Sequence, residues 1–269
     1  MEPFDVLAEE TGLPAIPLPP GLARIYGGDL ALEEESVYAN FVATIDGVVA
    51  IPSVRNSNTV IAGDNDADRF LMGLLRAVAD AVLIGAGVLR ASPKGTWRAE
   101  KIHPPAAESY ADLRMSLGLP EAPEIAILTG SGSIDPAHPV LEGRAVVLTS
   151  DAGAERLAGR LPGSATMLSL GAGPRLDGAR IVEALRARDH RRILSEAGPH
   201  TFGSLLDANA VDELFLTTSP FLAGDAGVGS RFGLVEAADL VPLVDCRMLG
   251  VRRHGAHLFT RYAIEKRAS

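Results

Sequence analysis

The sequence has little sulfur and few aromatic side chains, and it lacks the usual metal-binding motifs. A single cysteine, Cys246, excludes an intrachain disulfide and cannot build a thiolate zinc cluster or a CxxC redox pair. The default compartment for such a chain is the reducing cytoplasm. The six histidines form neither an HExxH motif nor the HxE…PCxxC motif of zinc deaminases, so we expect no metal site. No GxSxG motif is present, which disfavours a serine hydrolase.

The chain also lacks an excess of basic residues and a long apolar run. Lys and Arg number 25 against 34 Asp and Glu, giving a formal net charge of −9, whereas nucleic-acid binders need a concentrated positive field. The most apolar stretch, residues 74–89, contains Arg76 and Asp80 and is too short to cross roughly 30 Å of hydrocarbon. The first ten residues carry acidic side chains where a secretion signal carries basic ones. We therefore expect no nucleic-acid partner, no membrane partner and no secretion signal.

What the sequence does contain is enough apolar material for a large core. Apolar residues make up 47% of the chain and charged residues 22%, which is typical of one large globular domain. Residues 1–35 hold several prolines and the acidic run 33–35, which predicts an extended N-terminal arm. The globular domain is predicted to span residues 36–269.

Strand and helix signals alternate through this domain. Strands are predicted over 37–44, 81–84, 124–129, 145–149, 166–170, 193–195 and 213–219, and helices begin near Asp64, Asp151, Asp177 and Thr201. This alternation predicts an α/β fold with a mostly parallel sheet flanked by helices. The extended runs 243–252 and 256–264 are separated by Arg253-His254-Gly255, which predicts a C-terminal antiparallel hairpin that closes the sheet edge.

Four loops follow predicted strands and are candidates for a binding cleft, because open α/β sheets bind ligands beyond the carboxyl ends of their strands. They cover residues 43–47, 85–90, 129–132 and 196–201. In the last loop, a strand leads through small residues into a helix start, where free N–H groups attract phosphate. The same pattern also fits a plain strand-to-helix connection. The glycine turn at 85–87 alone is a weak dinucleotide signal, since no acidic residue follows at the usual distance.

Three polar residues near these loops have two interpretations each. Asp46 in an Asp-Gly pair is typical of a turn, and it is also placed to act on a ligand. Asn40 is either an ordinary polar residue of a strand or a ligand contact. Glu196 either caps the following helix or faces the cleft.

Taken together, these motifs resemble the reductase domain of riboflavin biosynthesis, the RibD C-terminal family, which has a dihydrofolate-reductase-like fold. The resemblance spans roughly residues 37–264. The segments that carry it are Asn40–Gly47, Leu75–Ala77, Asp80–Gly87, Glu196–Pro199, Leu205–Leu206, Val211–Leu214 and Pro220–Gly224.

The resemblance implies an NADPH-dependent reductase that converts the ribosylamino group of a phosphorylated pyrimidine to a ribitylamino group, or acts on a related heterocycle. It implies catalytic roles for Asp46 and Glu196 and substrate contacts from Asn40 and Arg76, with Arg76 a candidate for the substrate phosphate. The cofactor-binding residues that it implies are Ala43, Thr44, Gly85, Gly87, Val88, Leu89, Arg90, Thr129, Ser131, Ala197, Gly198, Pro199 and Thr201. A guanidinium such as that of Arg90 suits the adenosine 2′-phosphate.

The sequence departs from the family at several positions. Asn40 replaces a common Lys, Ala91-Ser92-Pro93 replaces Asp-Asn-Pro, Val88 replaces Thr, and Ala197 replaces Gly. NADPH binding therefore carries over better than substrate identity. A dihydrofolate or pteridine reductase and a non-catalytic nucleotide-binding paralogue stay open as alternatives. By analogy with the family we expect a homodimer in the cytoplasm.

Overall fold

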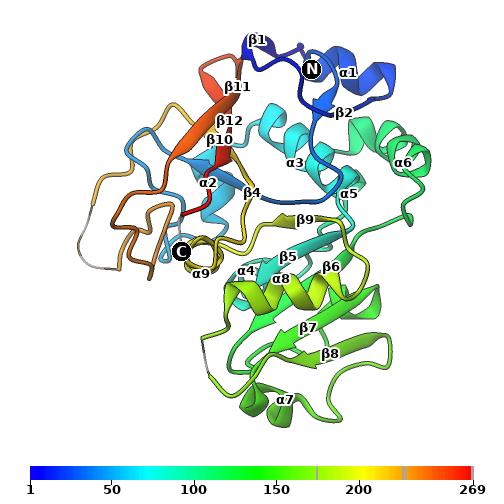
Figure 1. The fold of residues 1–269 in the computed structure, drawn as a ribbon, viewed down its shortest axis with the longest axis vertical. Coiled ribbons are helices and arrows are strands. Elements are labelled where there is room, and N and C mark those ends of the chain that lie inside the picture. The colour runs from blue at the N-terminus through cyan, green and yellow to red at the C-terminus, as the bar shows by residue number, and fades with distance from the viewer. Residues whose placement is uncertain (174, 226, 228, 268–269) are drawn as a thin grey trace.

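The computed structural model describes residues 1–173, 175–225, 227 and 229–267. Within these residues one sheet of ten strands runs through the molecule (Figure 1). Its strands in spatial order are β1 (Asp5–Glu9), β11 (Cys246–His254), β12 (His257–Ile264), β10 (Glu213–Thr218), β4 (Ser36–Ala43), β9 (Arg192–Ser195), β5 (Ala81–Gly85), β6 (Glu124–Thr129), β7 (Ala145–Thr149) and β8 (Ala165–Ser169).

The sheet is parallel from β10 to β8 and antiparallel at its other end. β12 pairs antiparallel with β10, and β11 pairs antiparallel with β12. The predicted fold class, an α/β fold with a mostly parallel sheet and a C-terminal antiparallel hairpin, is confirmed. The prediction that the hairpin closes the sheet was wrong, because β1 pairs with β11 and forms the edge.

Helices cover both faces of the sheet. On one face, α3 (Asp66–Val78) and α6 (Ala107–Ser116) pack against strand residues such as Val82 and Ile84. On the other face, α8 (Gly178–Arg186) and α9 (Pro199–Asp207) pack against residues such as Leu83. Successive side chains of β5 therefore enter two different cores, as expected for a strand buried on both sides.

Shorter elements fill the connections. They are β2 (Ala15–Ile16), α1 (Pro20–Tyr26), β3 (Leu30–Ala31), α2 (Ser57–Ala62), α4 (Ala86–Ala91), α5 (Ala99–Ile102), α7 (Asp151–Leu157) and 3₁₀ turns at Pro104–Ala106 and Pro139–Glu142. In the described part of the chain, no helix has the length and apolarity needed to span a bilayer.

Residues 1–35 pack onto the domain, where the sequence predicted an extended arm. Helix α1 begins at Pro20, whose missing N–H costs nothing in a first helical turn. Leu22 and Leu30 are fully buried, and the ring of Phe4 lies 4.7 Å from that of Phe259, between centroids. The apolar side chains between the prolines outweigh the proline signal for an extended chain.

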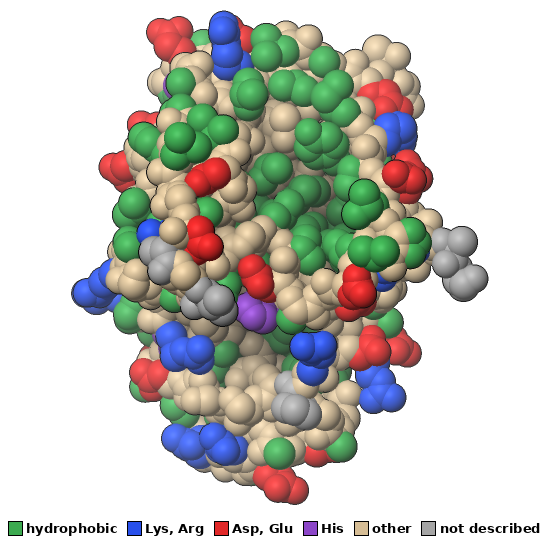
Figure 2. All heavy atoms as spheres, turned by 90° about the vertical axis from the view of Figure 1, so that its left-hand side faces the viewer, with side chains coloured by type: hydrophobic (Ala, Val, Ile, Leu, Met, Phe, Trp, Pro, Cys, Tyr) green, Lys and Arg blue, Asp and Glu red, His purple; other side chains and the backbone are tan. Residues whose placement is uncertain are grey.

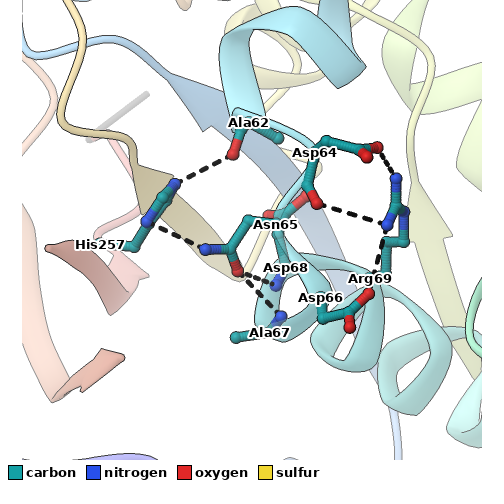
Figure 3. Close-up of polar contacts among 8 residues, drawn as sticks. All are labelled: Ala62, Asp64, Asn65, Asp66, Ala67, Asp68, Arg69 and His257. Carbon is teal, nitrogen blue, oxygen red and sulfur yellow. Dashed lines mark hydrogen bonds and ion pairs between the residues drawn. The ribbon is translucent and has the colours of Figure 1, made fainter. Parts of the chain in front are cut away.

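The start of α3 also differs from the prediction, which had Asp64 as the cap. The cap is Asn65, whose side-chain oxygen accepts hydrogen bonds from the N–H groups of Ala67 at 2.8 Å and Asp68 at 3.1 Å (Figure 3). The Asn65 amide nitrogen lies 3.1 Å from Nδ1 of His257, on β12, and Nε2 of that histidine lies 3.0 Å from the Ala62 carbonyl oxygen. These contacts fix the first turn of α3 to the sheet.

The strand order creates a crevice at the carboxyl ends of β9 and β5. The chain leaves β5 toward β6 on one side, whereas it leaves the adjacent strand β9 toward β10 on the other side. The helices that follow these two strands, α4 and α9, pack into the cores on opposite faces of the sheet. Such a point, where the connections of two adjacent strands diverge, is where open α/β sheets bind ligands.

Candidate active site

A large cavity of about 870 Å³ opens at this crevice. Its walls come from the loops after β5 and β9, from residues 50–52 and 54–59, and from Arg175, Leu176 and Phe232. A cavity of this size is in the range that binds nucleotide-sized ligands. Segments far apart in the sequence therefore form one binding site.

The two glycine loops touch at the back of the large cavity. A Cβ added at Gly85 would lie 2.8 Å from the carbonyl oxygen of Ala197, closer than real Cβ contacts allow. Only glycine at position 85 lets the loops after β5 and β9 approach this closely. The predicted convergence of these loops is thus present in the structure.

The start of α9 faces the large cavity and has the geometry of an anion site. Gly198 has φ 86° and ψ 172°, a conformation that only glycine adopts without strain. Pro199 follows at the first helical position, and among the described residues no side chain caps the helix. The N–H groups of the first turn and the positive end of the helix dipole are therefore available to a phosphate.

The charges around the large cavity are of one sign. Arg55, Arg90 and Arg175 line it together with His200, and no Asp or Glu is among the described residues that do so. Figure 2 shows Lys and Arg side chains gathered on the lower part of a face whose upper part is hollowed and hydrophobic. In a chain of net charge −9, a cavity free of carboxylates favours an anionic ligand.

A small cavity of about 280 Å³ adjoins the large one. The two share Asn58, Thr59, Val88, Gly198 and Pro199 among their walls. The small cavity also reaches Asn40, Asp68, Arg76 and Glu196. A ligand in the large cavity can therefore meet a second ligand in the small one.

A buried ion pair forms part of the wall of the small cavity. Nε and Nη2 of Arg76 donate to Oε1 and Oε2 of Glu196 at 2.9 and 2.7 Å, and the two side chains are only 7% and 8% exposed. This bidentate geometry fixes Glu196 at the cavity, where the sequence placed it, and excludes its alternative role as a cap of α9. It also takes up two donors of Arg76, which disfavours Arg76 as the main phosphate ligand.

Asn40 lines the small cavity with its side-chain oxygen buried and without a hydrogen-bond partner among the described residues. Buried polar atoms without partners are rare in folded proteins and mark places where a ligand completes the hydrogen bonding. The interpretation of Asn40 as a ligand contact is therefore favoured over that of an ordinary strand residue.

Asp68 is a residue of this cavity that the sequence did not single out. It is 6% exposed, and burial raises its pKa to about 6, an effect to which Glu196 adds and which the Thr217 hydroxyl and Arg76 partly offset. Asp68, Met72 and Arg76 are spaced by four residues on α3 and face the cavity together. The local sequence carries no signal that distinguishes Asp68 from the other acidic residues at the start of this helix.

Asp46 lies outside both cavities, contrary to the role expected for it. Its carboxylate accepts hydrogen bonds from the Thr44 hydroxyl and from the N–H groups of Ala223 and Gly224, at 2.7 Å for Gly224. These bonds lower the pKa of Asp46 to about 2. Asp46 is thus a turn residue that fixes the loop after β10.

The cofactor residues expected from the sequence divide into two groups. Eight line the large cavity, namely Gly85, Gly87, Val88, Arg90, Ala197, Gly198, Pro199 and Thr201. Five do not, namely Ala43, Thr44, Leu89, Thr129 and Ser131. Leu89 is 1% exposed in the core, and the Ala43 and Thr129 carbonyls accept hydrogen bonds from the hydroxyl groups of Ser219 and Thr149.

A third cavity of about 240 Å³ continues from the small one beyond Arg76, Ser92 and Trp97. Lys94, Arg98 and Lys101 line it, and it has no carboxylate among its described walls. Arg98 is paired with Glu100 and Glu121, whereas no ion pair joins Lys94 or Lys101 to a described residue. The third cavity is therefore a second candidate site for binding an anionic group.

Solved structures with the same fold are reductases by name. A pyrimidine reductase-like protein of Corynebacterium diphtheriae matches with a TM-score of 0.68 at 21% identity, over 91% of this chain and 99% of that one. The riboflavin biosynthesis reductase Rib7 of Saccharomyces cerevisiae matches with a TM-score of 0.60 at 12% identity, over 89% and 94%. At these identities the likeness establishes the fold.

A third match is the diaminohydroxyphosphoribosylaminopyrimidine deaminase/5-amino-6-(5-phosphoribosylamino)uracil reductase of Thermotoga maritima, with a TM-score of 0.62 at 20% identity over 86% of this chain. This chain covers 57% of that protein. No curated relative matches the sequence.

The model of the RibD C-terminal domain matches residues 35–258, which is most of the chain and includes every wall of the three cavities. The family is one of NADPH-dependent reductases. The chain therefore belongs to the RibD C-terminal domain family.

Proposed function

We propose that the protein is an NADPH-dependent reductase of a phosphoribosylamino-pyrimidine or a related heterocycle. The observation that carries this proposal is the pair of joined cavities, one lined by glycine loops, arginines and an uncapped helix start, the other by buried polar side chains. The large cavity suits a dinucleotide, and the small one suits a heterocycle. The wall that they share is where the two reacting carbons would meet.

The residues of the large cavity fit NADPH by their chemistry. The N–H groups of Gly198, His200 and Thr201 would hold the pyrophosphate, and the lack of a side chain at Gly85 lets the loops after β5 and β9 lie together beside it. Arg90 would bind the 2′-phosphate, since it is exposed at the large cavity and, among the described residues, its guanidinium donates only to the Ser133 carbonyl, at 3.2 Å. NADPH, when bound, supplies the hydride.

The residues of the small and third cavities fit the heterocycle and its phosphate. The buried side-chain oxygen of Asn40 would accept a hydrogen bond from the heterocyclic ring. The Arg76–Glu196 pair would orient the ring from the side. The phosphate would lie in the third cavity against Lys94 and Lys101, a revision of the expectation that placed it on Arg76. In this arrangement the protein contributes mainly by holding the cofactor and the substrate in the orientation needed for hydride transfer.

Two measurements test the proposal. NADPH should raise the melting temperature of the purified protein, because a ligand that binds only the folded state stabilises it. 5-Amino-6-(5-phosphoribosylamino)uracil should then speed the loss of the reduced nicotinamide absorbance. Oxidation with dihydrofolate alone would favour a pteridine reductase, and stabilisation without any oxidation would favour a non-catalytic nucleotide-binding protein.

We also propose that the protein acts as a homodimer in the cytoplasm. Ile45, Val60, Phe221 and Leu222 are exposed large apolar residues, and the Ile45 N–H donates to the Phe221 carbonyl, which places the two side by side. An apolar surface of this kind suits burial against a second copy of the chain. Light scattering should give twice the chain mass, and Leu222→Asp should shift it toward the monomer.

A further inference from the structure

The small cavity contains one buried acid that the ion pair leaves uncompensated. Arg76 binds Glu196 through two hydrogen bonds, so the charges of that pair largely cancel. Asp68 lies on the same stripe of α3, two turns before Arg76, and faces the same cavity. No ion pair joins the Asp68 carboxyl group to a described residue, and its burial favours the protonated, neutral form of the acid.

The surroundings of Asp68 are polar on several sides. Arg69 and Arg76 come from its own helix, Glu196 from the loop after β9, and Thr217 from β10. Arg69 pairs with Asp64 and Asp66 rather than with Asp68 (Figure 3). His257 reaches the same helix start through Asn65 and has its pKa lowered by burial, so it contributes no positive charge there at neutral pH.

We propose that Asp68 is the catalytic acid of the small cavity and donates the proton that accompanies hydride transfer to a substrate C=N bond. This inference rests on the proposed function. Dihydrofolate already contains the C=N bond, and in the phosphoribosylamino-pyrimidine it forms when the sugar ring opens to its imine isomer. The carbon of this bond gains the hydride taken from NADPH, which becomes NADP⁺. The nitrogen forms its new N–H bond with the proton of the Asp68 carboxyl group. Solvent then returns a proton to the Asp68 carboxylate.

The geometry assigns this role to Asp68 in preference to the other acids near the site. Asp46 lies outside the cavity and is bound by three donors. Glu196 is held by Arg76 on both oxygens. The Asn65 cap fixes the backbone of Asp68, and the contact from Asn65 to His257 fixes the helix start, so the Asp68 side chain extends from an anchored helix turn.

The test compares Asp68→Asn with Asp66→Asn in the full-length protein. Asp66 lies in the same helical turn with its side chain 71% exposed, so its substitution controls for charge. With 5-amino-6-(5-phosphoribosylamino)uracil or dihydrofolate, kcat of the wild type should fall as the pH rises above about 6, because the acid loses its proton. Asp68→Asn should lower kcat at least a hundredfold and abolish this dependence, and Asp66→Asn should change neither. Asp68→Glu should recover part of kcat together with a pH dependence.

Two readouts do not depend on turnover. Carboxyl carbon NMR, assigned by difference from Asp68→Asn, should show one aspartate that titrates near pH 6 in the NADP⁺-bound protein. The melting temperature of Asp68→Asn at pH 7.5 should equal or exceed that of the wild type, since a buried charge is removed. A merely structural role predicts a lower melting temperature and an unchanged pH profile.

The outcomes separate this inference from the proposed function. If NADPH is oxidised and the pH profile of Asp68→Asn matches that of the wild type, the inference is wrong and the proposed function stands. If NADPH gives no thermal protection, the proposed function fails by itself. If NADPH binds but neither heterocycle is reduced, the proposed function and the inference both fail. If NADPH is oxidised but no aspartate titrates near pH 6, the inference alone is overturned.

Discussion

The large and the small cavities are built on different principles. The large cavity is shaped by backbone, with close loop contact at Gly85, a left-handed glycine at 198 and an uncapped helix start, and its charged side chains are exposed at the rim. The small cavity is shaped by buried side chains from α3, β4 and the loop after β9. A site built from backbone groups recognises the phosphates of the cofactor, which are the same whatever the substrate is. A site built from side chains can change its substrate specificity through single substitutions. The departures from the family at Asn40 and Ser92 fall on the small cavity or on the wall that it shares with the large one.

The largest expected effect concerns the ion pair of the small cavity. Arg76→Met leaves Glu196 buried without its partner, which costs about 3–5 kcal/mol of folding free energy. Arg76→Met with Glu196→Leu should recover much of that loss, because the pair is removed together. Chemical denaturation measures both variants. If Arg76→Met alone were as stable as the wild type, Glu196 would be solvated and the small cavity would not be shaped by buried side chains.

The second effect concerns the backbone of the large cavity. Gly85→Ala puts a methyl group 2.8 Å from the Ala197 carbonyl and must push the two loops apart, so the Kd for NADPH should rise at least tenfold. Gly87→Ala is the matched control, since its added carbon meets nothing closer than Arg90 Nη2 at 4.0 Å. Equal effects of the two variants on NADPH titrations would contradict the close-contact account.

The third effect concerns the rim of the large cavity. Arg90→Ala should weaken NADPH binding roughly tenfold through loss of a charge-assisted contact and leave NADH binding nearly unchanged. Arg160, exposed and remote from the cavity walls, provides the control substitution. Loss of affinity for both dinucleotides in equal measure would place Arg90 elsewhere on the cofactor.

The fourth effect distinguishes the third cavity from the large one. Replacing Lys94 and Lys101 together by Ala should raise KM for the phosphorylated pyrimidine several-fold without changing NADPH affinity, because these side chains line only the third cavity. Steady-state kinetics at saturating NADPH give the comparison. A matching rise in the Kd for NADPH would show that the large and the third cavities form a single anion-binding site.

The smallest effect is expected at Asp46. Its folded-state pKa of about 2 is lower than the ordinary value of 3.8, so the ionised form contributes stability above about pH 4 that is lost as the pH falls toward 2. Asp46→Asn should loosen the 223–224 loop and lower the melting temperature slightly at pH 7, with kcat within a few-fold of the wild type. A hundredfold loss of kcat at unchanged stability would restore a chemical role for Asp46.

The sequence predicted the backbone site better than the side-chain site, for a physical reason. Glycine turns after strands are local features, so Gly85, Gly198 and Pro199 were found from their immediate neighbours. Asp68 depends on burial between α3 and β10, which no local pattern reveals. The hydrogen bonds that Asp46 accepts from Ala223 and Gly224 could not be foreseen, because those residues lie far away in the sequence.

The same distinction holds for the fold. The parallel strands and their crossover helices follow hydrophobic periodicity and were predicted within a few residues. The pairing of β1 with β11 joins the two ends of the chain and has no local signature, so the N-terminal segment was expected to be an arm. Long-range pairing is what the sequence alone did not reveal.

A crystal structure of the protein with bound NADPH would decide where the cofactor lies. We expect the pyrophosphate to lie against the N–H groups of Gly198, His200 and Thr201, and the nicotinamide to face Glu196 and the small cavity. A dinucleotide bound outside the large cavity, or with its adenine in the small one, would contradict this expectation.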